Sequence, residues 1–214
     1  MTGLEYLPPP PYLLNFSHPN WIDPFLVATF LPAKPRIFIF GPKEEAMKVG
    51  WRNRLIYWSE IAVPFKPSKS DLLDTTRRAV RVMDRGEVLA IAGEGRLSEM
   101  EGAIVPLEDG PAFFALRAKV SIVPMAIIGT RWLRFGKVVT LKIGPPVDRG
   151  GLRADRAGVA AMTVTLQAAM DDLLIGVVGD PPPGPFGRWL TDLFNERPWL
   201  NDVSADSGAD LPHD

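Results

Sequence analysis

Residues 12–25 read Y-L-L-N-F-S-H-P-N-W-I-D-P-F, and the organisation of the chain follows from this stretch. It begins with apolar and aromatic residues, as in a buried β-strand, and continues with polar residues and two prolines. Proline fixes its own φ angle and is favoured in the first turn of a helix. The stretch therefore predicts a strand that leaves its sheet near Ser17, a turn at Pro19 and a helix that starts near Pro24.

Five further segments have strand character and alternate with segments of helical period. They are short, rich in β-branched and aromatic residues, and bounded by glycine, proline or polar clusters. They cover residues 36–40, 61–65, 88–92, 121–128 and 138–143. Strands that alternate with helices form mostly parallel sheets with both faces covered, and ligands of such sheets bind where the strands end. We therefore expect an α/β fold with a mixed, mostly parallel sheet flanked by helices.

Apolar residues at helical spacing predict two helices around this sheet. Residues 68–86 have Ser70 as a candidate N-cap and Gly86 as a C-terminal stop. The apolar stripe of this first helix consists of Leu72, Leu73, Thr76, Val80 and Met83. The stripe of the second consists of Val159, Met162, Leu166, Met170 and Leu173.

The C-terminal part has a different character. The Pro/Gly segment G-D-P-P-P-G-P follows Gly176 and precedes a third amphipathic segment. Its predicted apolar face consists of Phe186, Trp189, Leu190, Leu193 and Phe194. We expect a single domain over residues 1–176, a linker and amphipathic helix over 177–202, and a disordered acidic tail over 203–214.

The composition limits the functions that are open to the chain. Its 214 residues are 46% hydrophobic and 23% charged, as in an ordinary globular protein, and a net charge of −1 gives no general attraction for nucleic acid. The absence of cysteine excludes disulfides, thiolate metal sites and a cysteine nucleophile. With two histidines and no cluster of carboxylates, we expect no metal site. No apolar run reaches the length of about 18 residues that would predict a membrane-spanning helix.

His18 and Asp23 have the spacing H-x-x-x-x-D (HX4D), and the other histidine, His213, lies in the polar tail. The first turn of the predicted helix would bring the Asp23 carboxylate back to the imidazole. A carboxylate on Nδ1–H fixes the tautomer and leaves Nε2 to take a proton from a hydroxyl group. The alternative is a structural histidine that caps the turn, and the spacing alone favours this alternative.

Residues 88–98, V-L-A-I-A-G-E-G-R-L-S, carry a second group of candidate site residues. Gly93 and Gly95 at the end of a strand let backbone N–H groups approach a ligand closely. Glu94 is a candidate acceptor for a hydroxyl group, and Arg96 is a candidate donor to an anion. The alternative is a tight turn without function.

Residues 121–130, S-I-V-P-M-A-I-I-G-T, form an apolar strand segment that contains Pro124. Proline cannot donate a hydrogen bond within a sheet, so Pro124 indicates an edge strand or a bulge. The alternative interpretation of this segment is a plain core strand.

Taken in this order, the three stretches resemble the motif blocks of the glycerolipid acyltransferases, typified by 1-acylglycerol-3-phosphate (lysophosphatidic acid) acyltransferase. S-H-P-N-W-I-D matches the H-x-x-x-x-D block of that family. G-E-G-R-L-S stands where the family has its Pro-Glu-Gly block, and V-P-M-A-I-I-G-T corresponds to its Val-Pro-Val block. The resemblance covers residues 3–147. Each block alone is unspecific, but the ordered set is specific.

The resemblance implies transfer of a fatty acyl group from acyl-CoA or acyl carrier protein to a hydroxyl group of a lysophospholipid. His18 would be the general base and Asp23 its orienting partner. Glu94, Gly95 and Arg96 would hold the glycerol and phosphate end of the acceptor. A thioester is already activated, so neither a covalent nucleophile nor a cofactor is needed.

The chain departs from the family pattern at three places. Ser17 stands where the first block usually has asparagine, and Ala92-Gly93 replaces a Phe-Pro pair. The second block has Lys66, with Lys69 as the alternative, in place of an arginine that binds phosphate. Lysine supplies a point charge without the bidentate fork of arginine. Two alternatives therefore stay open: a lipid-binding relative without catalysis, and an ester or thioester hydrolase that uses water.

The expected location is cytoplasmic, peripheral on the inner face of the cell membrane, and attachment to the membrane surface would need exposed elements. Candidates are the aromatic cluster of Trp51, Tyr57 and Trp58, the loop at residues 131–135, and the apolar face of the C-terminal helix. The alternative for each is packing onto the domain, and we favour this alternative for the C-terminal helix.

Overall fold

The computed structural model of the chain describes residues 1–43, 50–65, 72–98 and 102–195, and these contain a six-stranded sheet in the order β3-β2-β4-β1-β5-β6. The first five of these strands are parallel, and β6 pairs antiparallel with β5. The strands are β1 (Leu13–Phe16), β2 (Ile37–Lys43), β3 (Ala62–Phe65), β4 (Val88–Ala92), β5 (Ile122–Ile128) and β6 (Thr140–Ile143). All six predicted strands are present, so the predicted mixed, mostly parallel α/β sheet is confirmed.

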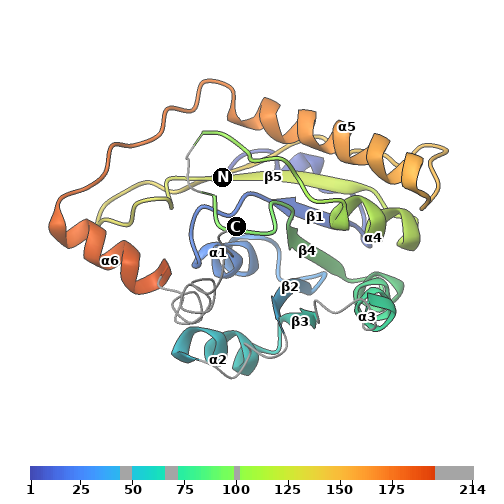
Figure 1. Cartoon of the computed structure of the whole chain (residues 1–214), viewed down its shortest axis with the longest axis horizontal. Coiled ribbons are helices and arrows are strands. Elements are labelled where there is room, and N and C mark those ends of the chain that lie inside the picture. The colour runs from blue at the N-terminus through green and yellow to red at the C-terminus, as the bar shows by residue number, and fades with distance from the viewer. Residues whose placement is uncertain (44–49, 66–71, 99–101, 196–214) are drawn as a thin grey trace, which may run out of the picture.

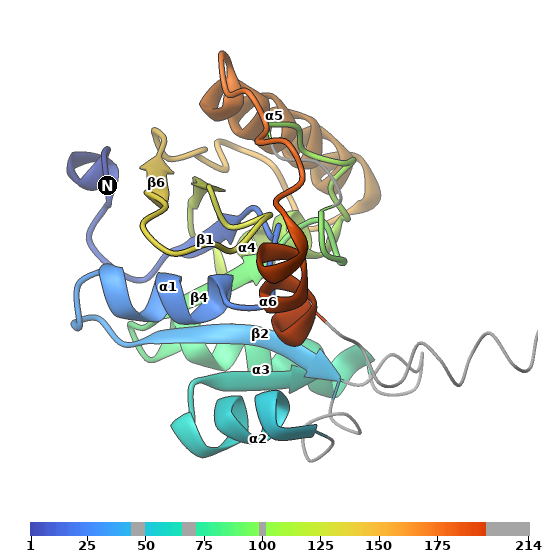
Figure 2. The same cartoon turned by 90° about the vertical axis from the view of Figure 1, so that its left-hand side faces the viewer.

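Helices cover both faces of the sheet (Figure 1). The helices of the described ranges are α1 (Asp23–Phe30), α2 (Gly50–Ser59), α3 (Leu72–Asp84), α4 (Gly110–Ala118), α5 (Arg156–Leu174) and α6 (Pro185–Asn195). A short 3-10 turn at Leu4–Tyr6 precedes them. Helices α3, α4 and α5 share the core of one face, and α1 packs into the core of the opposite face. An extended segment leads from α5 to α6 at the far end of the molecule (Figures 1 and 2).

The two cores meet in the central strands β4, β1 and β5. Alternate residues of a strand point to opposite faces of its sheet. Accordingly Leu13 of β1 belongs to the core under α3, α4 and α5, while Leu14 belongs to the core under α1. Both side chains are fully buried. These three strands therefore form the most protected part of the fold.

The predicted apolar stripe of α3 is only partly correct. Thr76 and Met83 are buried as predicted, but Leu72 and Leu73 are 55% and 69% exposed. The residues that α3 buries are Thr75, Thr76, Ala79, Val82 and Met83. The buried face includes the small residues Thr75 and Ala79 beside Val82 and Met83, and a search for large apolar residues passes over the small ones. The predicted stop is correct, because the helix ends at Asp84 and Gly86 has a φ angle of 77°. Ser70 lies outside the described residues.

Pro124 marks a bulge in the interior of the sheet. Met125 of β5 pairs with Ile143, whereas Ile122 forms a bridge with Val147. Ile122 and Met125 are three positions apart, whereas their partners Val147 and Ile143 are four positions apart. The partner segment therefore contains one extra residue at this point, which is a β-bulge. The amide that Pro124 lacks falls at this irregularity, and its carbonyl oxygen accepts from Gly144 N at 2.9 Å. Of the two predicted alternatives, the bulge is the one present.

A core substitution tests this description of the fold. Leu89 lies within β4 and is fully buried. We expect Leu89→Ala to lower the free energy of unfolding by about 2–5 kcal/mol, because buried contacts are lost and a cavity remains. Val164→Ala on α5, where the side chain is 70% exposed, should change it by less than about 0.5 kcal/mol. Urea denaturation measures both, and equal effects would contradict the assignment of the core.

Candidate active site

Three neighbouring strands deliver the candidate residues to one edge of the sheet. Strand β1 lies between β4 and β5 and is parallel to both, so their carboxyl ends meet at the same edge. His18 follows β1, Glu94 follows β4 and Thr130 follows β5. Ligands of parallel sheets bind at this edge. Residues that are far apart in the sequence are thereby brought into one site.

His18 and Asp23 form the predicted pair. The Nδ1 atom of His18 lies 3.1 Å from Oδ2 of Asp23, which is the first residue of α1. Asp23 is fully buried, and its Oδ2 also accepts from the backbone amide of Asn20 at 2.6 Å. The imidazole is 17% exposed, and Phe16 packs edge-on against it. Because Nδ1 faces the carboxylate, Nε2 is the ring nitrogen left for a ligand.

The carboxyl group of Asp23 responds to opposing influences. Burial raises its pKa above the usual range, and the hydrogen bond and charge of His18 lower it, followed by the Asn20 amide. The hydroxyl group of the fully buried Thr130 acts in the same lowering direction. Within the described part of the chain, neither Thr130 Oγ1 nor Asp23 Oδ1 makes a hydrogen bond of good geometry, so Thr130 acts on the carboxyl group only weakly.

Glu94 holds the backbone of His18. Its Oε1 atom accepts from the backbone amide of His18 at 3.0 Å, and the backbone amide of Ser98 donates to the His18 carbonyl oxygen at 2.8 Å. The loop after β4 therefore holds the histidine backbone on both sides. Glu94 is only 3% exposed, and burial raises the pKa of its carboxyl group while the His18 amide lowers it. The structure thus gives Glu94 a contact with His18 that the sequence did not predict.

Both glycines of the G-E-G stretch are required by the backbone. A Cβ atom at Gly93 would overlap with Oδ1 of Asn15 and would lie 3.2 Å from Leu107 Cδ2. Gly95 has a φ angle of 64°, which a residue with a side chain adopts only under strain. The Gly93 carbonyl oxygen accepts from the backbone amide of Glu108 at 2.8 Å, which fixes the loop.

The structure does not join either predicted cation to the His18–Asp23 pair. Arg96 is exposed on the loop that follows Gly95. Lys66 lies outside the described residues, so its place in the site stays a prediction. Across the described ranges, no group of three or more histidine, aspartate or glutamate side chains is placed to hold a metal ion.

The sequence interpretation missed three buried polar residues near the site, namely Asn15, Asn20 and Thr130. Asn20 Oδ1 accepts from the backbone amide of Ile22 at 3.1 Å and so shapes the turn between His18 and Asp23. Asn15 was detectable, because it is a polar residue inside an otherwise apolar strand. Nothing in the sequence alone connects Thr130 with Asp23, because their contact depends on the order of the strands.

The sequence of this chain matches the model of a known protein family. A family model described as Acyltransferase matches residues 1–128, which include β1 to β5 and thus His18, Asp23 and Glu94. The chain belongs to the acyltransferase family. The family that the sequence motifs indicated is thereby confirmed.

The fold of this acyltransferase also resembles a solved structure. That structure is the 1-acyl-sn-glycerophosphate (LPA) acyltransferase PlsC from Thermotoga maritima. The TM-score is 0.57 at 20% sequence identity, over 80% of this chain and 70% of the other. The predicted glycerolipid acyltransferase-like fold is thereby confirmed.

Replacement of the Glu94 charge tests its burial. Burial raises the pKa of Glu94 in the folded chain above the ordinary value of 4.5. At pH values between 4.5 and this raised pKa, the folded chain binds more protons than the unfolded chain. Ionisation of Glu94 therefore lowers the free energy of unfolding as the pH rises through this range. Glu94→Gln keeps an oxygen for the His18 amide and removes the charge. We expect the stability of the variant relative to the wild type to increase as the pH rises above 4.5 and then to level off. Urea denaturation over this range measures the difference, and a pH-independent difference would contradict a buried charge.

Proposed function

We propose that this acyltransferase transfers a fatty acyl group from a thioester, acyl-CoA or acyl carrier protein, to a hydroxyl group of a lysophospholipid such as 1-acylglycerol-3-phosphate. The observation that carries the proposal is the His18–Asp23 pair at the carboxyl edge of the sheet, joined at 3.1 Å. The family match and the fold shared with a protein named as an LPA acyltransferase support it.

In this mechanism, Nε2 of His18 removes the proton of the acceptor hydroxyl group as its oxygen attacks the thioester carbonyl carbon. The new C–O bond forms, the C–S bond breaks, and the proton passes from His18 to the departing thiolate. General base catalysis of this kind contributes about 10²–10⁴-fold in rate. The buried Asp23 carboxylate holds Nδ1–H and stabilises the imidazolium that forms during the transfer.

The remaining predicted residues would orient the acceptor. The exposed Gly95 would allow the acceptor to approach the backbone of the loop, while Arg96 and Lys66 would supply positive charge for a phosphate group. Gly93 would contribute only to the shape of the loop, because Asn15 fills the space beside it. Glu94 would act chiefly through the His18 backbone, which it contacts directly. We therefore treat Glu94 as a positioning residue in this mechanism.

The acceptor lipid places the reaction at a membrane surface, because lysophospholipids partition into bilayers. Acyl-CoA and acyl carrier protein reach such a surface from the cytoplasm, so we propose a peripheral location on the inner face of the cell membrane. No helix in the described ranges is both long and apolar enough to cross a membrane.

Transfer of a labelled long-chain acyl group from acyl-CoA to a panel of lysolipids tests the activity and the base together. We expect His18→Ala to lower kcat/KM by about 10²-fold or more. The matched control is His213→Ala, which removes the only other histidine and should leave the rate unchanged.

Each other outcome of this assay identifies a rival function. Bound lipid without any transfer would indicate the lipid-binding relative. Loss of the thioester without an acylated lipid would indicate the hydrolase. An equal loss of activity in both histidine variants would contradict the assignment of His18 as the base.

Asp23→Asn separates catalysis from stability. The variant keeps an oxygen for the Asn20 amide but cannot hold His18 Nδ1–H as a charged partner does, so we expect kcat to fall by about 10²-fold or more. Since burial raises the pKa of Asp23, the charged carboxylate weakens the fold at neutral pH. The variant should therefore unfold at no lower urea concentration than the wild type. A large loss of stability together with the loss of rate would indicate a merely structural role.

A further inference from the structure

Helix α6 packs onto the domain through its smallest residues. Gly187 and Thr191 are the buried residues of this helix. Thr191 Oγ1 accepts from the backbone amide of Leu133 at 2.9 Å and donates to the Gly187 carbonyl oxygen at 2.8 Å. A Cβ atom at Gly187 would lie 2.7 Å from Pro183 Cβ, so only glycine fits there. The helix is therefore fixed to the domain chiefly through this small-residue side, next to the half-buried Leu190 and Phe194.

Those large side chains point outward. Phe186, Trp189 and Leu193 are 58%, 57% and 38% exposed and follow one another at helical spacing. The ring of Phe135, which is 83% exposed, stacks on Phe186 with centroids 6.1 Å apart, and Phe186 lies 5.6 Å from Trp189. We call Phe135, Phe186, Trp189 and Leu193 the docking face. The predicted packing of this face onto the domain is wrong for its three α6 members, because the small-residue side of the helix faces inward.

The C-terminal end of α6 contacts the candidate active site. Asn195 Oδ1, at the end of α6, accepts from the backbone amide of Trp21 at 3.0 Å. Trp21 lies in the turn between His18 and Asp23. Phe194 contacts Trp51, which in turn contacts Trp21. Helix α6 therefore rests on the turn that carries the His18–Asp23 pair, while Phe186, Trp189 and Leu193 are exposed.

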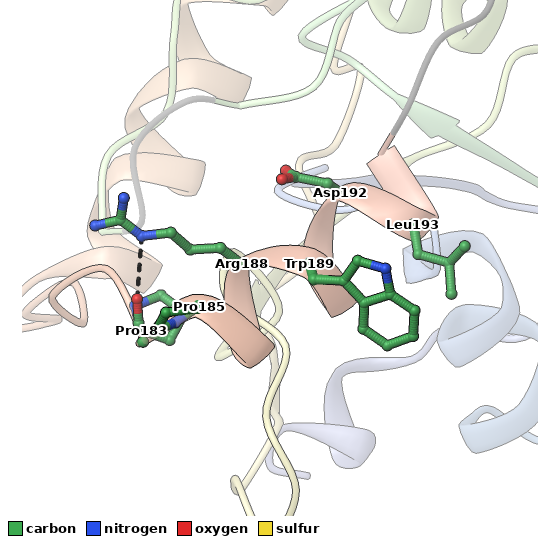
Figure 3. A pocket seen from close by; sticks show the side chains of 7 residues that line it. Pro183, Pro185, Arg188, Trp189, Asp192 and Leu193 are labelled. Atoms are coloured by element: carbon green, nitrogen blue, oxygen red, sulfur yellow. Dashed lines mark hydrogen bonds between the residues drawn. The ribbon is translucent and has the colours of Figure 1, made fainter.

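The polar groups beside the docking face carry both signs of charge. Next to Phe135, Arg134 and Lys137 both pair with Asp180. A groove along α6 is lined by Arg188 and Asp192 together with Trp189 and Leu193. Figure 3 shows Arg188 turned back to the Pro183 carbonyl oxygen, with the Trp189 and Leu193 side chains projecting on the other side. This border has three cations and two anions, and such a mixture offers no strong complementarity to a highly charged protein partner. The face is thus apolar and aromatic with a mixed polar border.

The size of the face argues against a second copy as its occupant. Three aromatic side chains of about 150–250 Å² each, exposed by half or more, amount to on the order of 400 Å². A stable protein interface needs about 800 Å² from each partner. Tryptophan and phenylalanine on one side of a short amphipathic helix are instead typical of elements that lie in the boundary between headgroups and acyl chains.

We propose that the docking face inserts into the surface of a lipid bilayer and presents the His18 site to acceptor lipids there. The inference rests on the proposed function, since a lysolipid acceptor has to reach His18 from a lipid surface. Contact of α6 with the Trp21 turn would keep the site close to the headgroup layer. The chemistry of transfer and the attachment to lipid are then carried by different elements of the chain.

Co-sedimentation with vesicles of equal parts phosphatidylcholine and phosphatidylglycerol tests the proposal on the full chain. We expect the double variant Phe186→Ser/Trp189→Ser to bind at least about tenfold more weakly, because two large apolar side chains no longer enter the lipid. The matched control is Trp58→Ser, which removes a 79% exposed tryptophan from α2 and should bind as the wild type does. Thermal unfolding of each variant shows whether it is folded, and we expect unchanged midpoints.

The possible results separate this proposal from the proposed function. Equal binding of wild type and double variant, or weaker binding of Trp58→Ser, would overturn the docking face. A dimer that dissociates only in the double variant would overturn it in favour of a second copy. Vesicle binding without acyl transfer would support the docking face and contradict the proposed function. Transfer to a water-soluble short-chain acceptor without vesicle binding would do the reverse.

Discussion

The site depends on two hydrogen bonds that hold the backbone of His18 from the loop after β4. Glu94 accepts from its amide and Ser98 donates to its carbonyl oxygen, at 3.0 Å and 2.8 Å. Without them, the segment that leaves β1 would be free to rotate, and Nδ1 of His18 would not remain opposite Asp23. A catalytic group has to be held close to its productive geometry by its surroundings. Here Glu94 and Ser98 contact the backbone of His18 and not its ring, so Nε2 of the imidazole stays available to a ligand.

This arrangement places two carboxyl groups in the interior of the protein. Removing an ionised carboxylate from water costs several kcal/mol, and hydrogen bonds offset part of this cost. Asp23 has the His18 ring and the Asn20 amide as donors, and Glu94 has the His18 amide. Burial raises the pKa of both groups despite these donors. Apolar side chains of similar size at these two positions would therefore make the fold more stable than the buried carboxyl groups do.

Local signals in the sequence were sufficient to predict the strands and the contact between His18 and Asp23, whereas the interpretation of this pair as a site needed the ordered set of motifs. The strands are short apolar runs with clear borders, and the pair lies within one turn whose prolines limit its conformation. The contact of Glu94 with His18 could not be predicted, because it joins residues 76 positions apart and requires β4 to lie beside β1. Strand order is a property of the whole chain rather than of any segment.

The errors at α3 and α6 have a common cause. In both helices the sequence interpretation assigned the largest apolar residues to the buried face. Helix α3 exposes Leu72 and Leu73 but buries the smaller Thr75 and Ala79, and α6 packs chiefly through Gly187 and Thr191. Close approach of a helix to its support favours small residues, which have little weight in an apolar pattern. Helices α2 and α4 were not predicted as separate elements, and α4 is apolar on most of its surface, so its pattern has no helical period to detect.

The buried carboxamide of Asn15 has a consequence for how accurately β1 and β4 align. Asn15 is paired with Ile91, and its side chain occupies the space that the missing Cβ of Gly93 leaves open. A slip of one residue between the two strands would bring Ala92 or Glu94 to the place of Gly93, where a Cβ atom would overlap with this amide. His18 and Glu94 each lie three positions beyond the Asn15–Ile91 pair. The fit of Asn15 against Gly93 therefore favours the observed register, which places His18 level with the carboxylate that holds it.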